Sequence, residues 1–153
     1  RAKKDPESSV KYACYTVLGE LNSKEGEEYL ASILTDKKQG DTSKIKASEV
    51  LIKYGDSSSV NKVIELAKST LTDDKKKPLR YALGKVFANT ENSSLAEICL
   101  EYLNSKDAAT VGTGLDIFAK NKFPSVRAEV QKIADAEKTS ANRTKARKIL
   151  DRE

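Results

Sequence analysis

Residues 43–56 read SKIKASEVLIKYGD, and this stretch decides the fold because its pattern returns along the whole chain. A basic residue followed at fixed spacing by two apolar residues recurs in VKYACYTVLGEL at 10–21 and LRYALGKVFANT at 79–90. Further copies begin at 111 and 142, so the starts lie 33, 36, 32 and 31 residues apart. A period of this length predicts stacked helical repeats.

Each period contains two amphipathic segments. In the first copy, Val10, Cys14 and Leu18 are spaced as one face of a helix, and Leu30 and Leu34 mark a second helix. No useful length alternates with the period of a strand. We therefore predict a single all-α domain of about four and a half helix pairs, an α-α superhelix or solenoid. The expected repeats span about 7–38, 41–73, 77–105, 107–138 and a partial 141–153.

The turns between helices carry recognisable signals. Gly55 follows a periodic run and predicts a left-handed C-cap. The serines at 57–59 offer N-cap hydroxyls for the next helix. Pro124 is expected at the start of a later helix.

Composition excludes several classes of function. The 153 residues include no histidine, which removes the usual general base, the histidine-dependent nucleophiles and most zinc and iron sites. We therefore expect no catalytic residue, no metal and no cofactor. No apolar run approaches the roughly 20 residues that cross a bilayer. Methionine is absent even from position 1, so we expect a processed or excised part of a longer chain, bacterial origin and a cleaved export signal both remaining open.

Three residue types have a structural and a functional interpretation. Cys14 and Cys99 are expected to be buried small hydrophobes rather than a disulfide or reactive thiols. Gly112 and Gly114, inside a predicted helix, are expected to allow tight packing between repeats. The tyrosines near the edges of the apolar faces are candidates for partner contact, whereas the one in the quoted stretch is placed in the core; the edge tyrosines are Tyr12, Tyr15 and Tyr81, and the core one is Tyr54.

The repeated residues resemble the HEAT-repeat family. Val10-Lys11, Cys14 and Leu18-Gly19, and then Lys44, Ala47, Leu51 and Tyr54-Gly55-Asp56, are similar to its short bacterial-type, PBS-lyase-like form. The likeness extends from about Val10 to Leu150, although Gly112 replaces the basic residue in the fourth copy. The resemblance implies a right-handed superhelix whose second helices line a concave side.

The recurring basic residue has two interpretations. Lys11, Lys44, Arg80 and Arg143 would form a phosphate-binding ladder or, as the family resemblance implies, a structural ladder. The structural interpretation is favoured because Asn22, Asp56 and Glu91 lie at the turns where such bases need partners.

The net charge of +5 suggests nucleic acid, but the distribution of charge disfavours it. The basic residues gather on predicted first helices, including the dense run 143–152, whereas the second helices are mixed to acidic. A function follows from this: a non-catalytic scaffold, expected to be monomeric, that binds another protein or peptide through its second helices. An accessory role beside an enzyme and nucleic-acid binding remain alternatives. The predicted partner-binding residues are Glu28, Lys62, Glu65, Glu97, Glu101, Arg127 and Lys132.

Overall fold

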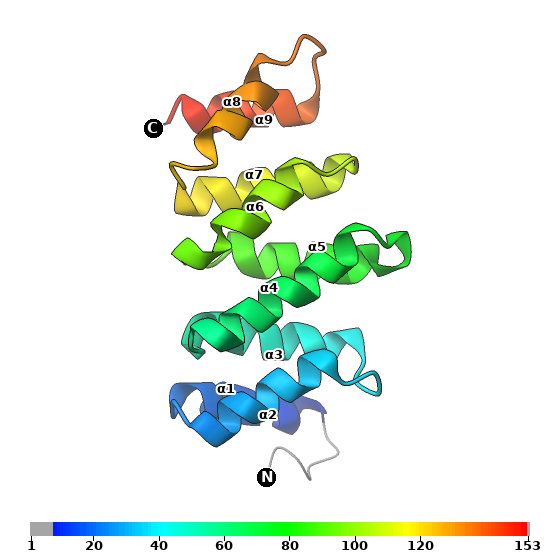
Figure 1. Ribbon diagram of the computed structural model, residues 1–153, viewed down its shortest axis with the longest axis vertical. Helices are drawn as coiled ribbons and strands as arrows, with labels where there is room; N and C mark the ends of the chain where they lie inside the picture. The colour runs from blue at the N-terminus through cyan, green and yellow to red at the C-terminus, as the bar shows by residue number, and fades with distance from the viewer. Residues whose placement is uncertain (1–7, 153) are drawn as a thin grey trace. The chain divides into compact units, whose positions relative to one another are not determined.

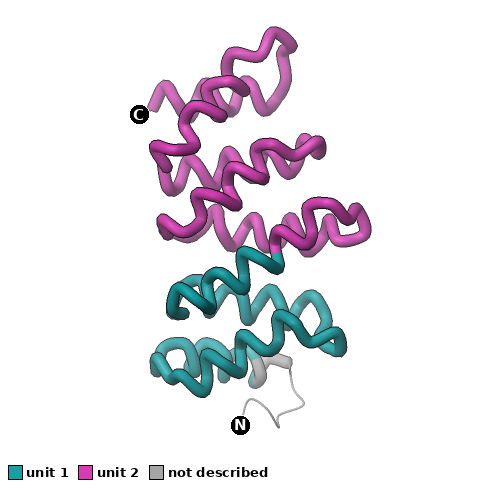
Figure 2. Tube along the Cα trace, viewed as in Figure 1, with its two compact units in different colours: residues 1–66 teal, residues 67–153 magenta. Residues whose placement is uncertain are grey.

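The computed structural model describes the backbone of residues 8–152 and the side chains of residue 10 and residues 12–152. The chain divides into two compact units, residues 1–66 and 67–153 (Figure 2). The first unit holds α1 (Ser8–Glu20), α2 (Lys24–Thr35), α3 (Asp41–Tyr54) and most of α4 (Ser57–Leu71), which ends in the second unit.

The second unit continues with two short 3₁₀ turns and five α-helices. These are η1 (Asp74–Lys76), α5 (Lys77–Ala88), η2 (Ser93–Leu95), α6 (Ala96–Leu103), α7 (Ala108–Asn121), α8 (Arg127–Asp135) and α9 (Ala141–Leu150). No residue from 8 to 152 belongs to a strand. The predicted all-α class, with four helix pairs and one further helix within the described residues, is confirmed.

Three details at the helix ends differ from the sequence-based predictions. Gly55 is extended, with φ −75°, so the left-handed C-cap is wrong. Glycine is required there for space, because a Cβ would lie 2.5 Å from the Leu51 carbonyl oxygen. The serines at 57–59 lie inside α4, and its cap is Asp56, whose Oδ1 accepts the Ser59 N–H at 2.8 Å. Pro124 opens a turn, and α8 begins only at Arg127.

In the first unit, α3 packs against both α1 and α2. Gly19 of α1 is the contact point, since a Cβ there would collide with Val50 and lie 2.9 Å from the Tyr54 ring. Val50 is 7% exposed and Leu51 1% exposed as a result. The core of this unit therefore lies among three helices: the first helices of two successive repeats, α1 and α3, and the second helix of the earlier repeat, α2.

In the second unit, α7 is central because it packs against α5, α6 and α9 (Figure 1). Gly114 lies against the backbone nitrogen of Leu103, and Gly84 lies against Thr113 and Tyr102. The prediction that Gly114 serves tight packing between repeats is confirmed. Gly112 faces α9, where Lys145 Nζ donates to its carbonyl oxygen at 2.7 Å.

Candidate functional site

Arg80 occupies the repeated basic position of α5 and is only 1% exposed. Its Nε donates to the Thr70 carbonyl oxygen at 2.9 Å, and its Nη2 donates to the carbonyl oxygens of Thr70 and Asp73. These acceptors lie where α4 ends and its last carbonyls lack partners within the helix. Arg80 therefore closes the end of the preceding helix, which is a structural role.

The predicted turn-acid partners of the basic ladder are wrong for Arg80 and Arg143. Asp56 accepts from Ser59, and the Glu91 carboxylate pairs with Lys120 Nζ at 2.9 Å. Arg143 Nη1 donates to the Thr139 hydroxyl, in the turn just before α9, at 3.0 Å. The side chain of Lys11 lies outside the described residues. At Arg80 and Arg143 the recurring base therefore does not bind a turn acid, and the Arg80 guanidinium is satisfied by backbone carbonyls at a helix end instead.

Two residues without a predicted role connect neighbouring repeats. Asn121 Oδ1 accepts the Asn92 N–H at 2.8 Å, and its Nδ2 donates to the Thr90 carbonyl oxygen at 2.9 Å. Glu27 Oε1 accepts the Asp56 N–H at 2.7 Å. Both residues lie near the turns, but asparagine and glutamate are common there, so the sequence carried no signal that distinguished them.

An open cleft of about 690 Å³ lies in the second unit between the ends of α4 and α6. We call it the α4–α6 cleft. Its apolar surface comes from Leu71 and Leu100, and Leu100 is 36% exposed. Its remaining lining is polar: Thr72, Asp74, Arg80, Glu101, Asn104, Ser105, Lys106 and Asp107. This volume is within the range of sites that hold ligands or side chains of a partner.

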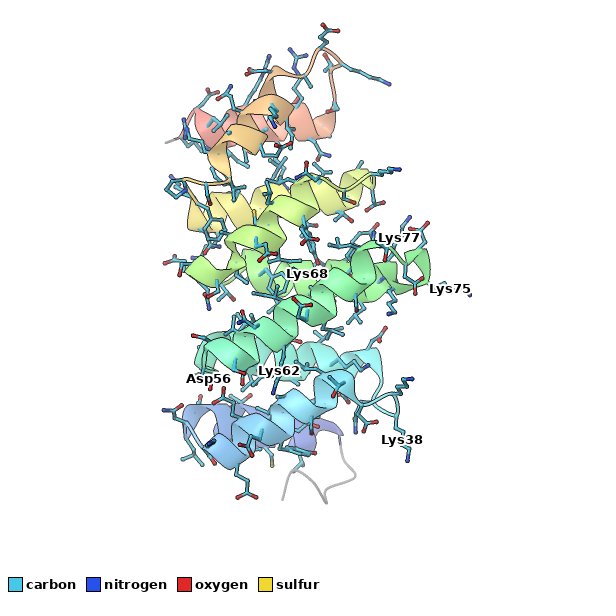
Figure 3. All side chains as sticks on the ribbon, viewed as in Figure 1. Lys38, Asp56, Lys62, Lys68, Lys75 and Lys77 are labelled. Carbon is cyan, nitrogen blue, oxygen red and sulfur yellow. The ribbon has the colours of Figure 1, made fainter. Side chains whose placement is uncertain are left out.

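Lysines bridge acidic side chains on both flanks of this cleft. Lys68 Nζ lies 2.7 Å from a Glu97 oxygen and 3.7 Å from a Glu101 oxygen, joining α4 to α6. Lys77 Nζ lies 3.4 Å from Asp74 and 3.7 Å from Asp107. Figure 3 labels both lysines. Each lysine meets two acids, so each of these groups carries a net negative charge.

Asp107 is held in its ionised form. Its Oδ2 accepts from the Thr110 hydroxyl at 2.7 Å, the Thr110 N–H at 2.9 Å and the Tyr81 hydroxyl at 2.9 Å. The Thr110 hydrogen bond, followed by the Tyr81 bond and the Lys77 charge, lowers the pKa of Asp107 to about 2. The hydrogen bond between the Tyr81 hydroxyl and the Asp107 carboxylate raises the pKa of Tyr81. The cleft therefore keeps this negative charge at any physiological pH.

The structure brings two of the seven predicted site residues together, Glu97 and Glu101 on α6, through Lys68. Lys132 pairs with Glu129 of its own helix at 2.8 Å, and Arg127 is exposed at the start of α8. Glu28 is exposed on α2 and Lys62 and Glu65 are exposed on α4, all in the first unit. Leu100 lies off the spacing of the buried residues on α6, and this departure is the sequence signal for its exposure.

The thiols and tyrosines give a mixed result. Cys99 is buried, its Sγ donates to the Gly114 carbonyl oxygen at 3.4 Å, and burial raises its pKa to about 12, which makes it a poor nucleophile. Cys14 is half-buried and, like Cys99, is not in a disulfide. Tyr15 is fully buried rather than an edge residue, and Tyr54 is half-buried rather than fully in the core.

Two further features bear on the class of site. Among the residues that the structure describes, no group of three or more Cys, Asp or Glu side chains could hold a metal ion. No helix within 8–152 is both long and apolar enough to cross a bilayer.

The paired helices, the contacts between neighbouring repeats and a cleft lined mostly by polar side chains define a helical-repeat scaffold. A family model described as Spirochaete HEAT repeat protein matches residues 1–149, and the chain belongs to this HEAT-repeat family. No curated protein matches the chain. HEAT repeats are generally non-catalytic scaffolds.

Proposed function

We propose that this protein is a non-catalytic scaffold that binds another protein or a peptide through its second helices, with the α4–α6 cleft as the principal contact. The observation that carries the proposal is the exposure of Leu100 in a cleft of about 690 Å³ beside two lysine-bridged acidic groups. An apolar side chain surrounded by a polar rim is an arrangement that protein–protein interfaces use.

The charges around the cleft indicate the chemistry of the partner. Four acidic side chains, Glu97, Glu101, Asp74 and Asp107, outnumber the three lysines at the cleft, Lys68, Lys77 and Lys106, and the Arg80 guanidinium is buried on backbone carbonyls. An apolar side chain flanked by lysine or arginine would bury Leu100 and replace part of the lysine contacts. A phosphate backbone would instead meet these carboxylates, which opposes nucleic-acid binding.

The experiment is a peptide-display selection against the full chain, followed by affinity measurement on the selected peptides by fluorescence polarisation. We expect peptides with an apolar residue next to basic ones. Glu97→Lys with Glu101→Lys should weaken their binding by about tenfold or more, because like charges then face each other. Leu100→Asp should do the same.

The matched control combines Glu49→Lys with Glu91→Lys. Both acids are exposed and paired with a lysine, as Glu97 is, but they lie on α3 and in a turn rather than on a second helix. The control should leave affinity unchanged, and circular dichroism should show that each variant is folded. Peptides that bind all three variants equally well would overturn the cleft as the contact surface.

A further inference from the structure

The Arg80 guanidinium does not use all of its hydrogen-bond donors at the end of α4. Its Nε and Nη2 donate to the carbonyl oxygens of Thr70 and Asp73. Its Nη1 donates to no acceptor in the part of the chain that the structure describes. Each terminal nitrogen of a guanidinium carries two N–H groups, so both donors of Nη1 remain unused.

This nitrogen faces the α4–α6 cleft. Arg80 lines the cleft, although the residue is only 1% exposed. Arg143 Nε is a fully enclosed nitrogen without a hydrogen-bond partner, and Arg80 Nη1 is not enclosed in that way. The open side of Nη1 is therefore the cleft rather than the protein interior.

An unused charged donor at the floor of a cleft is a position where a bound molecule supplies an oxygen. A nearly buried donor without an acceptor costs free energy, and a ligand oxygen recovers that cost. The bonds from Nε and Nη2 already hold the Arg80 guanidinium in place. Binding at Nη1 therefore requires little ordering of the side chain, which favours affinity.

The neighbouring charges select the charge of that oxygen. Asp107 and Glu101 line the same cleft, and the low pKa of Asp107 keeps it ionised at physiological pH. A carboxylate or phosphate oxygen on Nη1 would be repelled by these two acids. Lys106 also lines the cleft but is exposed, so its charge is screened more than those of the half-buried acids. A neutral carbonyl oxygen accepts the hydrogen bond without the repulsion.

The apolar part of the cleft indicates where this carbonyl comes from. Leu71 and Leu100 lie in the same lining as Arg80, so a peptide that places an apolar side chain on them also brings its backbone to Nη1. In an α-helix the interior carbonyl oxygens accept N–H groups four residues later, and only the last turn has free ones. An extended segment has carbonyl oxygens free along its length.

We propose that Arg80 Nη1 donates to a backbone carbonyl oxygen of the bound peptide, and that the peptide is extended where it crosses the α4–α6 cleft. The inference rests on the proposed function, because it requires that this cleft binds a peptide. Arg80 then has two roles: its Nε and Nη2 close the end of α4, and its Nη1 positions the backbone of the ligand.

The test uses the selected peptides whose binding Leu100→Asp weakens. Each peptide carbonyl in turn is replaced by a thiocarbonyl, whose sulfur is a weaker acceptor, and affinity for the full chain is measured by fluorescence polarisation. We expect one position, beside the apolar residue, to lose about fivefold or more in affinity, because a hydrogen bond to a charged donor is weakened there. The same replacement at the other positions is the matched control and should change affinity little.

A second measurement reads Arg80 directly, because replacing this residue would also destabilise the fold. Nuclear magnetic resonance of the ¹⁵N-labelled full chain follows the exchange of the Nη1 hydrogens with water. A saturating peptide should slow this exchange by about tenfold or more, since the new hydrogen bond protects them. The Arg143 Nε signal, from the same unit, should not change.

The conformation of the peptide is tested by a side-chain lactam between residues i and i+4, which holds the peptide helical. We expect the lactam to weaken binding by about tenfold or more, because the helix engages the carbonyl that Nη1 needs.

The outcomes separate this inference from the proposed function. A peptide that depends on Leu100 but leaves the Nη1 exchange unchanged, or has no sensitive carbonyl, would overturn the role of Arg80 in binding and leave the cleft as the contact. A lactam-linked peptide that binds as tightly as the linear one would do the same. If no selected peptide depends on Leu100, Glu97 or Glu101, the proposed function fails, and the role of Arg80 in binding fails with it.

Discussion

Helices α5 and α9 carry an arginine at the same position of the repeat, yet the two arginines do different things. Arg80 of α5 is buried on the final carbonyls of α4, whereas Arg143 of α9 is half-buried and reaches only Thr139. The end of α8 is instead bound by Arg147, whose Nε donates to the Ala134 carbonyl oxygen at 2.8 Å. The last carbonyl oxygens of α4 and α8 both need hydrogen-bond donors, but the arginine that supplies the donor occupies a different repeat position in each case.

The largest expected effect comes from removing each arginine in turn. Arg80→Met should lower the free energy of unfolding by about 2–4 kcal/mol, because it leaves buried carbonyls without charge-assisted donors. Arg143→Met, the matched change at the same repeat position, should cost no more than about 0.5 kcal/mol. Urea unfolding of both variants measures the difference. Equal losses would show that burial of Arg80 does not govern its contribution.

The second prediction concerns the hydroxyl that holds the backbone of Arg80. Tyr102 is fully buried, and its hydroxyl donates to the Arg80 carbonyl oxygen at 2.9 Å. Tyr102→Phe should cost about 1–1.5 kcal/mol, since it removes a buried hydrogen bond to that carbonyl. Tyr81→Phe removes a hydroxyl from the better-solvated Asp107 carboxylate and should cost less. A larger loss for Tyr81→Phe, measured by thermal or urea unfolding, would contradict the ranking.

The third prediction concerns the residues that cap α7 and α9, where the difference in stability is expected to be smallest. Asp107 and Ser140 each accept an N–H from the third residue of their helix, at 2.9 and 3.1 Å. Replacing either by alanine should cost roughly 1 kcal/mol at pH 7. The folded-state pKa of Asp107 is lowered to about 2, so its contribution is complete above the unfolded pKa near 3.9 and is lost as pH falls toward 2.

Unfolding measured from pH 7 down to pH 2 therefore distinguishes the two caps. The difference between the parent chain and Asp107→Ala should shrink between about pH 4 and pH 2, whereas the difference for Ser140→Ala should stay constant. Parallel curves for both variants would show that the Asp107 carboxylate does not contribute through its charge.

Much of the fold follows from local pattern. The spacing of Ala47, Leu51 and their equivalents predicts the first helices, because a helix buries one face at a period of 3.6 residues. The helix ends were harder to predict. Asp56 and Ser59 both have capping side chains, and the choice between them depends on Glu27, which arrives from another helix to bind the Asp56 N–H.

The candidate site was predicted in part. Glu97 and Glu101 follow from their place on the exposed side of a second helix, but the lysine that joins them lies 29 residues from Glu97. Leu100 beside them departs from the spacing of the buried residues on α6, but the cleft that it lines forms only when α4 and α6 are placed together. All seven predicted site residues, including Glu97 and Glu101, remain predictions.

The period, the helix pairs and the lack of histidine side chains can be read from the sequence alone, because they depend on residue type and spacing along one chain. Tertiary structure decided which of several similar residues acts. Arg80 rather than Arg143 is buried, Asp56 rather than a serine caps α4, and Val50 is covered where Val17 is exposed. Each outcome depends on whether a neighbouring helix supplies carbonyls, a carboxylate or a glycine at the right distance, and a single helix carries no information about its neighbours.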